Sequence, residues 1–346
     1  MTIVEVDRRI TGGVDTHLDV NVAAALDEIG GLLGVESFAT TVDGNQALIS
    51  WLDSFGCVDL VGVEGTGSYG ASLTRALARR GVAVVEVDQP NRQRRRQAGK
   101  SDPIDAVEAA RAAQGGRARG LAKSRTGNVE AIRALSVARR SARSVRVKTM
   151  NQIRHLGFTA PDDLRERLDG VSRSQLGAVA ASLRPRPGSD PVTFATKTAL
   201  RVLGRRLLHL DSEMNELDGQ LTELVAATAP ELVALYGIGT DTAALLLVAA
   251  GDNPERLRSE AAWAHLCGVS PIQASSGKTV RHRLNRSGDR QANHALWRIA
   301  MVRMSHDDRT RDYVARRLDE GKTKREIMRI LKRYIAREVY KNLPRD

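Results

Sequence analysis

The sequence has little that would cross-link a protein or anchor it in a membrane. Two cysteines are present, Cys57 and Cys267, and neither belongs to a CxxC or Cys/His cluster. We therefore exclude disulfides and structural zinc, and we expect both side chains to be small members of the core. No apolar run reaches the roughly 18–20 residues of a membrane span, and the start MTIVEVDRRI has no signal-peptide pattern. These absences predict a cytoplasmic protein with no membrane partner.

Aromatic residues are also scarce, with 4 Phe and 3 Trp among 346 residues, whereas 53 basic residues exceed 41 acidic ones. The resulting net charge of +12 attracts polyanions, of which nucleic acid is the first candidate. Because arginine supplies most of this charge, phosphate contact is favoured over the stacking of bases on aromatic side chains. The competing interpretation is a solvated basic surface without a partner.

Short β-type and helical segments alternate in the first third of the chain. The runs ITGGVDT, VNVAAAL and GVESFATTV predict three successive strands. A helix at 45–55, the strand VDLVGVE ending at Glu64, a helix at 73–80 and the strand VAVVEV follow. A further helix begins near Pro103, whose fixed φ suits a first helical turn. The order βββαβαβ predicts an RNase H-like α/β domain over residues 1–125.

The rest of the chain is predicted to be all-α. Residues 126–230 show the leucine spacing of long amphipathic helices, and the prolines of SLRPRPGSDPVT predict two such helices joined by a loop, as a hairpin or coiled coil. Residues 231–346 form a third, mainly helical domain. We expect the long helices to join copies of the chain into a homo-oligomer, a dimer or a tetramer.

Four acidic residues fall where an RNase H-like sheet would bring them together. Asp15 ends the first strand, Glu64 ends the fourth, and Asp102 and Asp105 begin the next helix. The first and fourth strands are neighbours in such a sheet, and helical residues three apart face the same way. A carboxylate cluster is unfavourable unless a hard cation neutralises it. We therefore predict that all four acids bind Mg²⁺ or Mn²⁺, which would catalyse phosphoryl transfer.

Each of these acids also has a local interpretation. Asp15 could bound a turn, and Glu64 in EGTGSYG could cap the following helix. Asp102 could be an N-cap, and Asp105 could favour the helix dipole. The histidines, His17 among them, are scattered along the chain, and we interpret them as structural or phosphate-contacting residues.

Two glycine-bearing segments lie in the last third. LYGIGTDTAALLL looks like the turn and second helix of a helix-hairpin-helix, in which Gly237 and Gly239 let backbone N–H groups approach a DNA phosphate. An ordinary turn between helices is the alternative. Downstream, Ser275 and Ser276 precede a glycine, and the residues alone favour a polar turn over a nucleophile. The basic residues expected to contact phosphates there are Lys278, Arg281, Arg283 and Arg286.

Three segments, GVDTHLD, VGVEGTGSYG and KSDPIDAVEAARAA, resemble a known family. It comprises the DEDD-type insertion-sequence transposases with a RuvC-like N-terminal domain, described as serine-dependent, RNA-guided bridge recombinases. The resemblance covers nearly the whole chain, including the third domain. It implies that the four acids form the DEDD metal site and that Ser276, with Ser275 as the alternate, is the nucleophile that becomes joined to DNA. It also implies a guide RNA as a partner.

The predicted function is therefore that of a transposase or site-specific recombinase, which cuts and rejoins double-stranded DNA at an element end and a target. A RuvC-like junction nuclease, in which water attacks, is the first alternative. An ATP-binding protein of the actin-like superfamily would need a phosphate loop that is missing after the first strand. A non-catalytic DNA-binding protein would leave the four acids unexplained. Because Ser276 and the acids are expected on different domains, we expect them to meet by docking between subunits.

Overall fold

The computed structural model describes residues 8–87, 101–118 and 120–344. By its internal packing the chain divides into two compact units. The sheet unit comprises residues 1–130, 249–290 and 344–346, and the helical unit comprises residues 131–248 and 291–343. The segment that carries the serine loop thus packs with the sheet, whereas the division at residues 125 and 230 stays a prediction.

A six-stranded mixed sheet forms the centre of the sheet unit. Its strands are β1 (Arg9–Thr16), β2 (Val20–Leu26), β3 (Leu32–Ala39), β4 (Cys57–Glu64), β5 (Ala83–Val87) and β6 (Gly120–Leu121). They lie in the order β3-β2-β1-β4-β5-β6. β1 runs antiparallel to β2 and parallel to β4, so the carboxyl ends of β1 and β4 lie at one edge of the sheet. The predicted RNase H-like order of strands and helices is confirmed.

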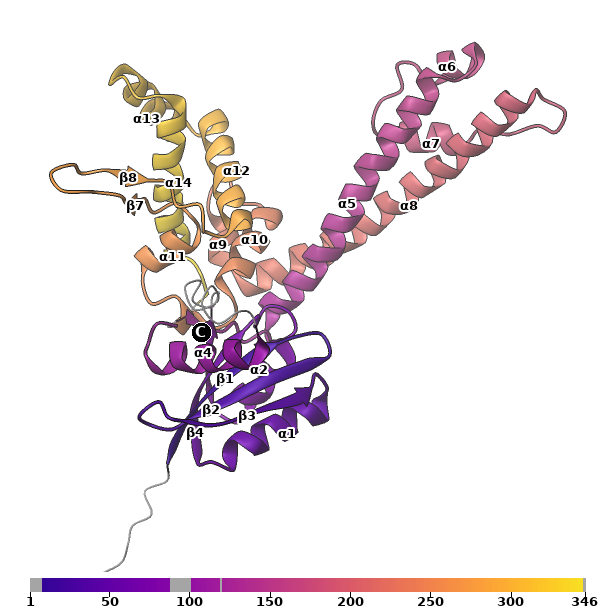
Figure 1. Cartoon of the computed structure of the whole chain (residues 1–346). Helices are drawn as coiled ribbons and strands as arrows, with labels where there is room; N and C mark the ends of the chain where they lie inside the picture. The colour runs from indigo at the N-terminus through magenta and orange to yellow at the C-terminus, as the bar shows by residue number, and fades with distance from the viewer. Residues whose placement is uncertain (1–7, 88–100, 119, 345–346) are drawn as a thin grey trace, which may run out of the picture. The chain divides into compact units, whose positions relative to one another are not determined.

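Helices cover both faces of this sheet (Figure 1): α1 (Val42–Asp53) and α2 (Ala71–Arg79) cover one, and α4 (Asp102–Gln114) covers the other. Side chains of the strands alternate between the two faces, as the pleat requires. In β2, Ala23 and Ala25 enter the core that α1 and α2 share, whereas Val22 and Ala24 pack with Ala106 of α4. The sheet is therefore buried on both sides, which explains the apolar runs of its central strands.

The closest packing in the sheet unit lies between α4 and the two strands β1 and β4. A Cβ atom on Gly13 of β1 would lie 2.1 Å from the backbone nitrogen of Ala110, and one on Gly62 of β4 would lie 2.5 Å from the carbonyl oxygen of Ala109. Only glycine fits at both positions, because these neighbours are backbone atoms that cannot move aside. The matching face of α4 consists of small side chains, Ala106, Ala109, Ala110 and Ala113, all buried.

Residues 249–290 are joined to the rest of the sheet unit by hydrogen bonds to its backbone. The Asp252 carboxylate accepts from Val129 N at 2.8 Å, Asn253 Nδ2 donates to the Ala122 carbonyl at 3.0 Å, and Arg256 Nε donates to the Leu121 carbonyl at 3.0 Å. Lys123 lies beside them, and burial lowers its pKa to about 8. This segment continues through η1 (Pro254–Arg256), α11 (Glu260–Leu266) and a hairpin of β7 (Ile272–Gln273) and β8 (His282–Arg283).

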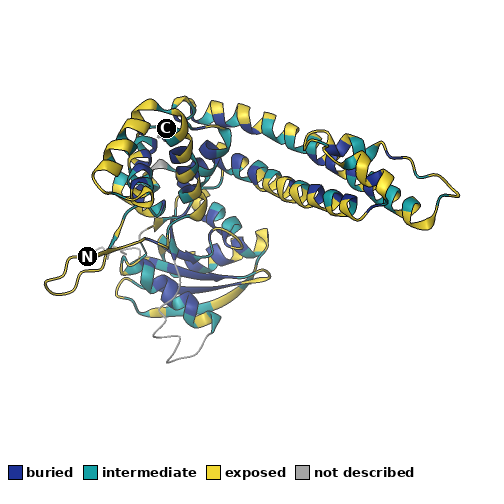
Figure 2. Cartoon of the chain, turned by 90° about the horizontal axis from the view of Figure 1, so that it is seen from above, coloured by how far each residue is buried: buried dark blue, intermediate teal, exposed yellow. Residues whose placement is uncertain are grey.

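Two long helices, α5 (Asn128–Phe158) and α8 (Pro191–Thr228), lie side by side in the helical unit (Figure 1). Arg139 and Arg146 of α5 pair with Asp218 and Asp211 of α8, respectively. The pairing residues are seven apart on each helix and run in opposite directions, which fits an antiparallel heptad arrangement. Figure 2 shows exposed residues along the outer sides of both helices. The connection between them contains α6 (Asp162–Leu168) and α7 (Leu176–Ala181). The predicted pair of long helices is confirmed.

Five further helices complete the helical unit. They are α9 (Pro230–Ala234), α10 (Thr240–Ala250, to Val248 in this unit), α12 (Arg290–His306, from Gln291), α13 (Asp308–Asp319) and α14 (Lys324–Lys341). Asp241 in the first turn of α10 joins three of the unit's helices, because its carboxylate lies 2.8 Å from Arg139 Nη1 and 3.4 Å from Arg298 Nη1. Hydrogen bonding to Asp218 raises the pKa of Arg139.

The prediction for the cysteines is half wrong. Cys267 is buried, and burial raises the pKa of its thiol. Cys57 is exposed, because it is the first residue of β4, where the strand emerges from the core. Within the described ranges, the structure contains no helix with both the length and the apolar character needed to cross a bilayer.

The contact between α4 and the sheet can be tested with two matched substitutions. Gly13→Ala places a methyl group against the backbone of α4. We expect a loss of about 3 kcal/mol in the free energy of unfolding, the upper end of the usual range for overpacking, measured by urea denaturation. Gly120→Ala adds the same methyl group in open space and should change stability by less than about 0.5 kcal/mol. Equal effects of the two substitutions would contradict the close contact.

Candidate active site

Strand alternation directs two of the predicted acids to the same face of the sheet. Val14 of β1 and Val63 of β4 are paired in register, and both lie in the core under α1 and α2. The next residues, Asp15 and Glu64, therefore point to the opposite face, which α4 covers. The Thr16 hydroxyl donates to the Glu64 carbonyl oxygen at 2.7 Å and ties the two strand ends together.

The helix brings the other two acids to the same edge. The face of α4 that packs on the sheet contains Ala106, Ala109 and Ala113. Asp102 and Asp105 precede these residues at helical spacing, so they extend this stripe of the helix toward its first turn. Asp105 is 3% exposed, whereas the side chain of Asp102, at the solvent end of the stripe, is 47% exposed. The sequence thus places one buried and one open carboxylate at the start of α4.

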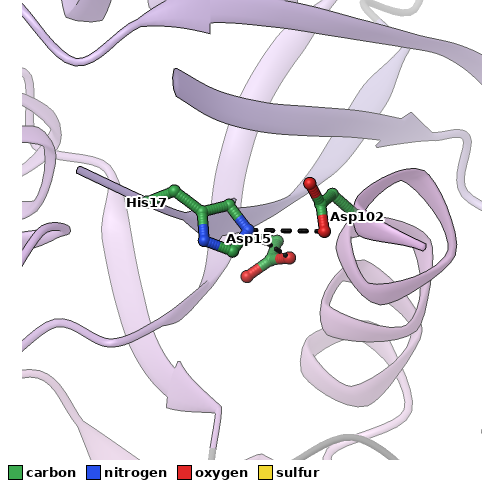
Figure 3. A group of neighbouring side chains, drawn as sticks. All are labelled: Asp15, His17 and Asp102. Atoms are coloured by element: carbon green, nitrogen blue, oxygen red, sulfur yellow. Dashed lines mark hydrogen bonds and ion pairs between the residues drawn. The ribbon is translucent and has the colours of Figure 1, made fainter. Parts of the chain in front are cut away.

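Three side chains at this edge lie close enough to share a cation (Figure 3). They are Asp15, His17 and Asp102, whose ligand atoms all lie within 4.8 Å of one another. His17 Nε2 lies 3.2 Å from Asp15 Oδ2 and 3.5 Å from Asp102 Oδ1. His17 was missed as a site residue by sequence reasoning, although its position just after the strand that carries Asp15 is a usable signal. Among the described residues, Asp105 and Glu64 lie outside this three-residue group.

The electrostatics of the cluster centre on Asp15. Burial raises the pKa of its carboxyl group, and the negative charges of Asp105 and Asp102 raise it further, while His17 opposes both effects. A divalent cation would relieve this cost. The donor set fits such an ion, because carboxylate oxygens suit Mg²⁺ and Mn²⁺, and the exposed Asp102 side leaves room for water or phosphate ligands.

Two local interpretations of the acids are wrong. Ser101, not Asp102, occupies the N-cap position of α4, and Asp102 is the first residue of the helix. The N-cap of α2 is Gly70, with no side-chain hydrogen bond, so Glu64 does not cap that helix. Asp102 and Asp105 do lie in the first turn of α4, where negative charge is favourable to the helix dipole.

The two candidate serines differ in their surroundings. Ser276 N and Thr279 N exchange hydrogen bonds with the opposite carbonyls at 3.1 Å, which closes a two-residue turn with Gly277 at φ +56°. The Ser275 hydroxyl is engaged with the backbone nitrogen of Arg281 at 3.2 Å. The Ser276 side chain is exposed and has no hydrogen-bond partner among the described residues. The nearby basic residues Lys278, Arg281, Arg283 and Arg286 are all exposed.

The glycine turn lies between α9 and α10. Gly237 has a φ of +78°, which explains the need for glycine there, and a Cβ at this position would lie 3.4 Å from Arg303 Cγ of α12. Gly239 is exposed in open space directly before α10. The sequence also contains an arginine-rich segment at 92–96, for which we expect phosphate contacts, but it lies outside the described residues.

Comparison with known proteins identifies the class to which this fold and acidic edge belong. Residues 12–156 match the model of the DEDD transposases of IS110, described as a transposase. Residues 229–315 match the model described as the transposase IS116/IS110/IS902 family. The first match contains Asp15, Glu64, Asp102 and Asp105, and the second contains Ser275 and Ser276.

The chain belongs to the IS110 family of transposases. A curated relative is an uncharacterised 43.6 kDa protein of the insertion element IS110 from Streptomyces coelicolor. The two are 31% identical over 136 residues, which is 38% of this chain and 33% of the relative. The chain therefore spans about a third of the length of this relative.

Cation binding at the acidic edge can be measured by thermal unfolding with added Mg²⁺ or Mn²⁺. A cation at a hundredfold excess over its Kd should stabilise the wild-type protein by about 2.7 kcal/mol. Asp15→Asn should remove this effect, and without added cation it should be at least as stable as the wild type, because it relieves repulsion. Asp163→Asn, at an exposed carboxylate of the helical unit, is the matched control. An unchanged response of the Asp15 variant to the cation would mean that the site is misassigned.

Proposed function

We propose that this chain is the transposase of an insertion sequence, which cuts and rejoins double-stranded DNA with a metal-dependent acidic site and a serine nucleophile. The proposal rests on the meeting of Asp15 from β1 with Asp102 from α4 at one edge of an RNase H-like sheet, in a chain of the IS110 family. Asp15, Glu64, Asp102 and Asp105 are the proposed DEDD residues, and His17 joins them.

The acids would hold the divalent cation while the open side of Asp102 admits a DNA phosphate. Bound Mg²⁺ or Mn²⁺ would supply Lewis-acid stabilisation of charge on the phosphoryl oxygens. Asp15 is fixed by its strand and buried at the floor of the site, so it gives the site a rigid ligand. His17 Nε2, within reach of both carboxylates, can hold a proton or orient Asp15 and Asp102.

Ser276 would act by exchanging one phosphodiester for another. Its Oγ forms a bond to the phosphorus, the bond to one DNA oxygen breaks, and the serine proton is transferred to a base or to the departing oxygen. The covalent link preserves the phosphodiester, and a DNA hydroxyl can later attack it and release the serine. No external energy source is needed, because the number of P–O bonds is unchanged.

The surroundings of the two serines favour Ser276 over Ser275. The Ser276 hydroxyl is exposed at the last position before the turn, whereas that of Ser275 is occupied by the backbone of Arg281. The exposed Lys278, Arg283 and Arg286 are placed to neutralise a DNA phosphate.

Further DNA contacts are proposed at the glycine turn. The exposed backbone of Gly239 precedes α10, and its N–H group has no hydrogen-bond partner among the described residues. A backbone N–H group at such a position can donate to a phosphate without reading the base sequence. Gly237 shapes the turn through its positive φ.

Assembly and guidance complete the proposal. Several apolar side chains on the long helices are exposed, which favours a partner chain along the hairpin in a dimer or tetramer: Val137, Val145, Val147, Val202 and Leu208. A guide RNA, implied by the resemblance to bridge recombinases, is proposed as the source of target choice, and the chain's charge of +12 would favour its binding.

A metal-dependent junction nuclease is the second candidate function, favoured by the acidic edge alone. In that case water would attack the phosphodiester, and the exposed serine hairpin would only bind phosphate. The two functions differ in whether DNA becomes linked to the protein.

A covalent intermediate is the direct test of the nucleophile. Purified protein is mixed with labelled DNA carrying the element ends, quenched in denaturant and analysed for labelled protein, with the linked residue found by mass spectrometry. We expect an adduct with the wild type and with Ser275→Ala but none with Ser276→Ala, because only the Ser276 hydroxyl is exposed and uncommitted.

DNA cutting is followed in the same reactions. Loss of the adduct in Ser276→Ala with cutting retained would favour the nuclease. An adduct that persists in Ser276→Ala and disappears in Ser275→Ala would show that the wrong serine was chosen.

A further inference from the structure

The helical unit contains a cleft that no part of the proposed reaction uses. It opens between α12, α13 and α14 beside Tyr236, which precedes the glycine turn, and its volume is about 630 Å³. This volume falls in the range of pockets that enclose a small organic ligand. The cleft lies entirely within residues 131–248 and 291–343, so it belongs to one compact unit.

Tyrosines gather at this cleft in a chain that has few aromatic residues. Three of its 5 tyrosines, Tyr236, Tyr313 and Tyr334, line the cleft. Tyr236 is 53% exposed and Tyr334 is 49% exposed, so about half of each residue is open to solvent. Tyr313 meets Tyr334 edge-on, with ring centroids 6.1 Å apart, and the guanidinium of Arg317 lies 5.6 Å from the Tyr313 ring. The rings are thus held in position while two of them stay open.

The charge of the cleft is positive. Four cationic side chains, Arg303, Arg309, Arg337 and Lys341, line it against two carboxylates, those of Asp307 and Glu338. Both carboxylates are already engaged. Asp307 accepts from the backbone nitrogen of Thr310 as the N-cap of α13, and Glu338 pairs with Arg303 Nη1 at 2.6 Å. The cleft therefore offers a net attraction for an anionic group.

One buried polar atom at the cleft, Nη2 of Arg303, has no hydrogen-bond partner among the described residues. The Tyr313 hydroxyl, in contrast, interacts with the side chains of Arg317 and Tyr334. The rest of the Arg303 guanidinium is fixed, because Nε donates to the Tyr236 carbonyl at 2.9 Å and Nη1 pairs with Glu338. A buried polar group without a partner is costly and rare in proteins, so this donor indicates a missing acceptor.

We propose that this cleft binds an unpaired nucleotide of a single-stranded nucleic acid. The base would stack on the ring of Tyr334 or Tyr236, and its edge would accept from Arg303 Nη2. The flanking phosphates would meet Arg309 and Lys341. A nucleotide has a flat base that can stack on the tyrosines, acceptor atoms for the buried donor, and a negative phosphate charge for the cationic side chains. A base inside a duplex cannot enter, because both of its faces are covered.

The inference is independent of the proposed cutting chemistry. The cleft contains neither the acidic cluster nor Ser276, so binding there should persist in Ser276→Ala and Asp15→Asn proteins. If no nucleotide binds at the cleft, the proposed transposase function is unaffected. If the protein does not cut DNA, the proposed binding at the cleft is unaffected.

Photo-crosslinking locates the bound base directly. The full-length protein is irradiated with short single-stranded oligonucleotides that carry 5-iodouracil, as DNA and as RNA, and with the same sequence as a duplex. We expect crosslinks to Tyr236, Tyr313 or Tyr334 with the single strands and not with the duplex. The stronger of the DNA and RNA signals identifies the source of the strand. Crosslinks confined to residues outside the cleft, or equal crosslinking of the duplex, would overturn the inference.

Binding measurements with variants test the contribution of stacking. In fluorescence anisotropy with the same oligonucleotides, Tyr334→Ala should weaken binding about five- to a hundredfold, whereas Tyr334→Phe, which keeps the ring, should bind within about twofold of the wild type. Phe194→Ala removes an exposed aromatic ring of α8 outside the cleft and is the matched control. Arg309→Gln should weaken binding mainly at low salt, since it removes a phosphate contact. Equal affinity of the Tyr334→Ala protein and the wild type would contradict the proposal.

Discussion

The close approach of α4 to strands β1 and β4 is the contact on which the acidic site depends. Gly13 and Gly62 remove the side chains that would separate helix and sheet, and the alanine face of α4 fills the space that remains. Because the same helical stripe continues into Asp102 and Asp105, packing that buries alanines at one end places carboxylates over the strand ends at the other. The apolar core and the site are thus set by one interface.

This arrangement gathers negative charge at one edge of the sheet. Asp15 is buried beside other carboxylates, and His17 offers one nitrogen to two of them. A divalent cation, with the phosphates it attracts, can compensate the charge of such a cluster. The serine hairpin, in contrast, is exposed and basic. Both features lie in the sheet unit, in segments far apart in the sequence.

The sequence predicts features that follow from local periodicity. The order of strands and helices and the placement of Asp15 and Glu64 at strand ends follow from alternation and turn residues, which act over a few positions. The packing of residues 249–290 with the sheet could not be predicted, because it depends on single side-chain bonds to distant backbone groups, such as that of Asn253 to Ala122. The exposure of Cys57 was missed for a related reason, since apolar neighbours do not reveal where a strand leaves the core. The tyrosine cleft joins residues of separate helices, which no local pattern brings together.

We propose that the contact of α4 with the sheet creates a site for a divalent cation between β1 and α4. The most direct measurement is an anomalous difference map from crystals of the protein grown with Mn²⁺. We expect a peak within ligand distance, about 2.0–2.4 Å, of carboxylate oxygens from both Asp15 and Asp102. Manganese bound only elsewhere, with these two carboxylates lacking a metal in a well-ordered site, would contradict it.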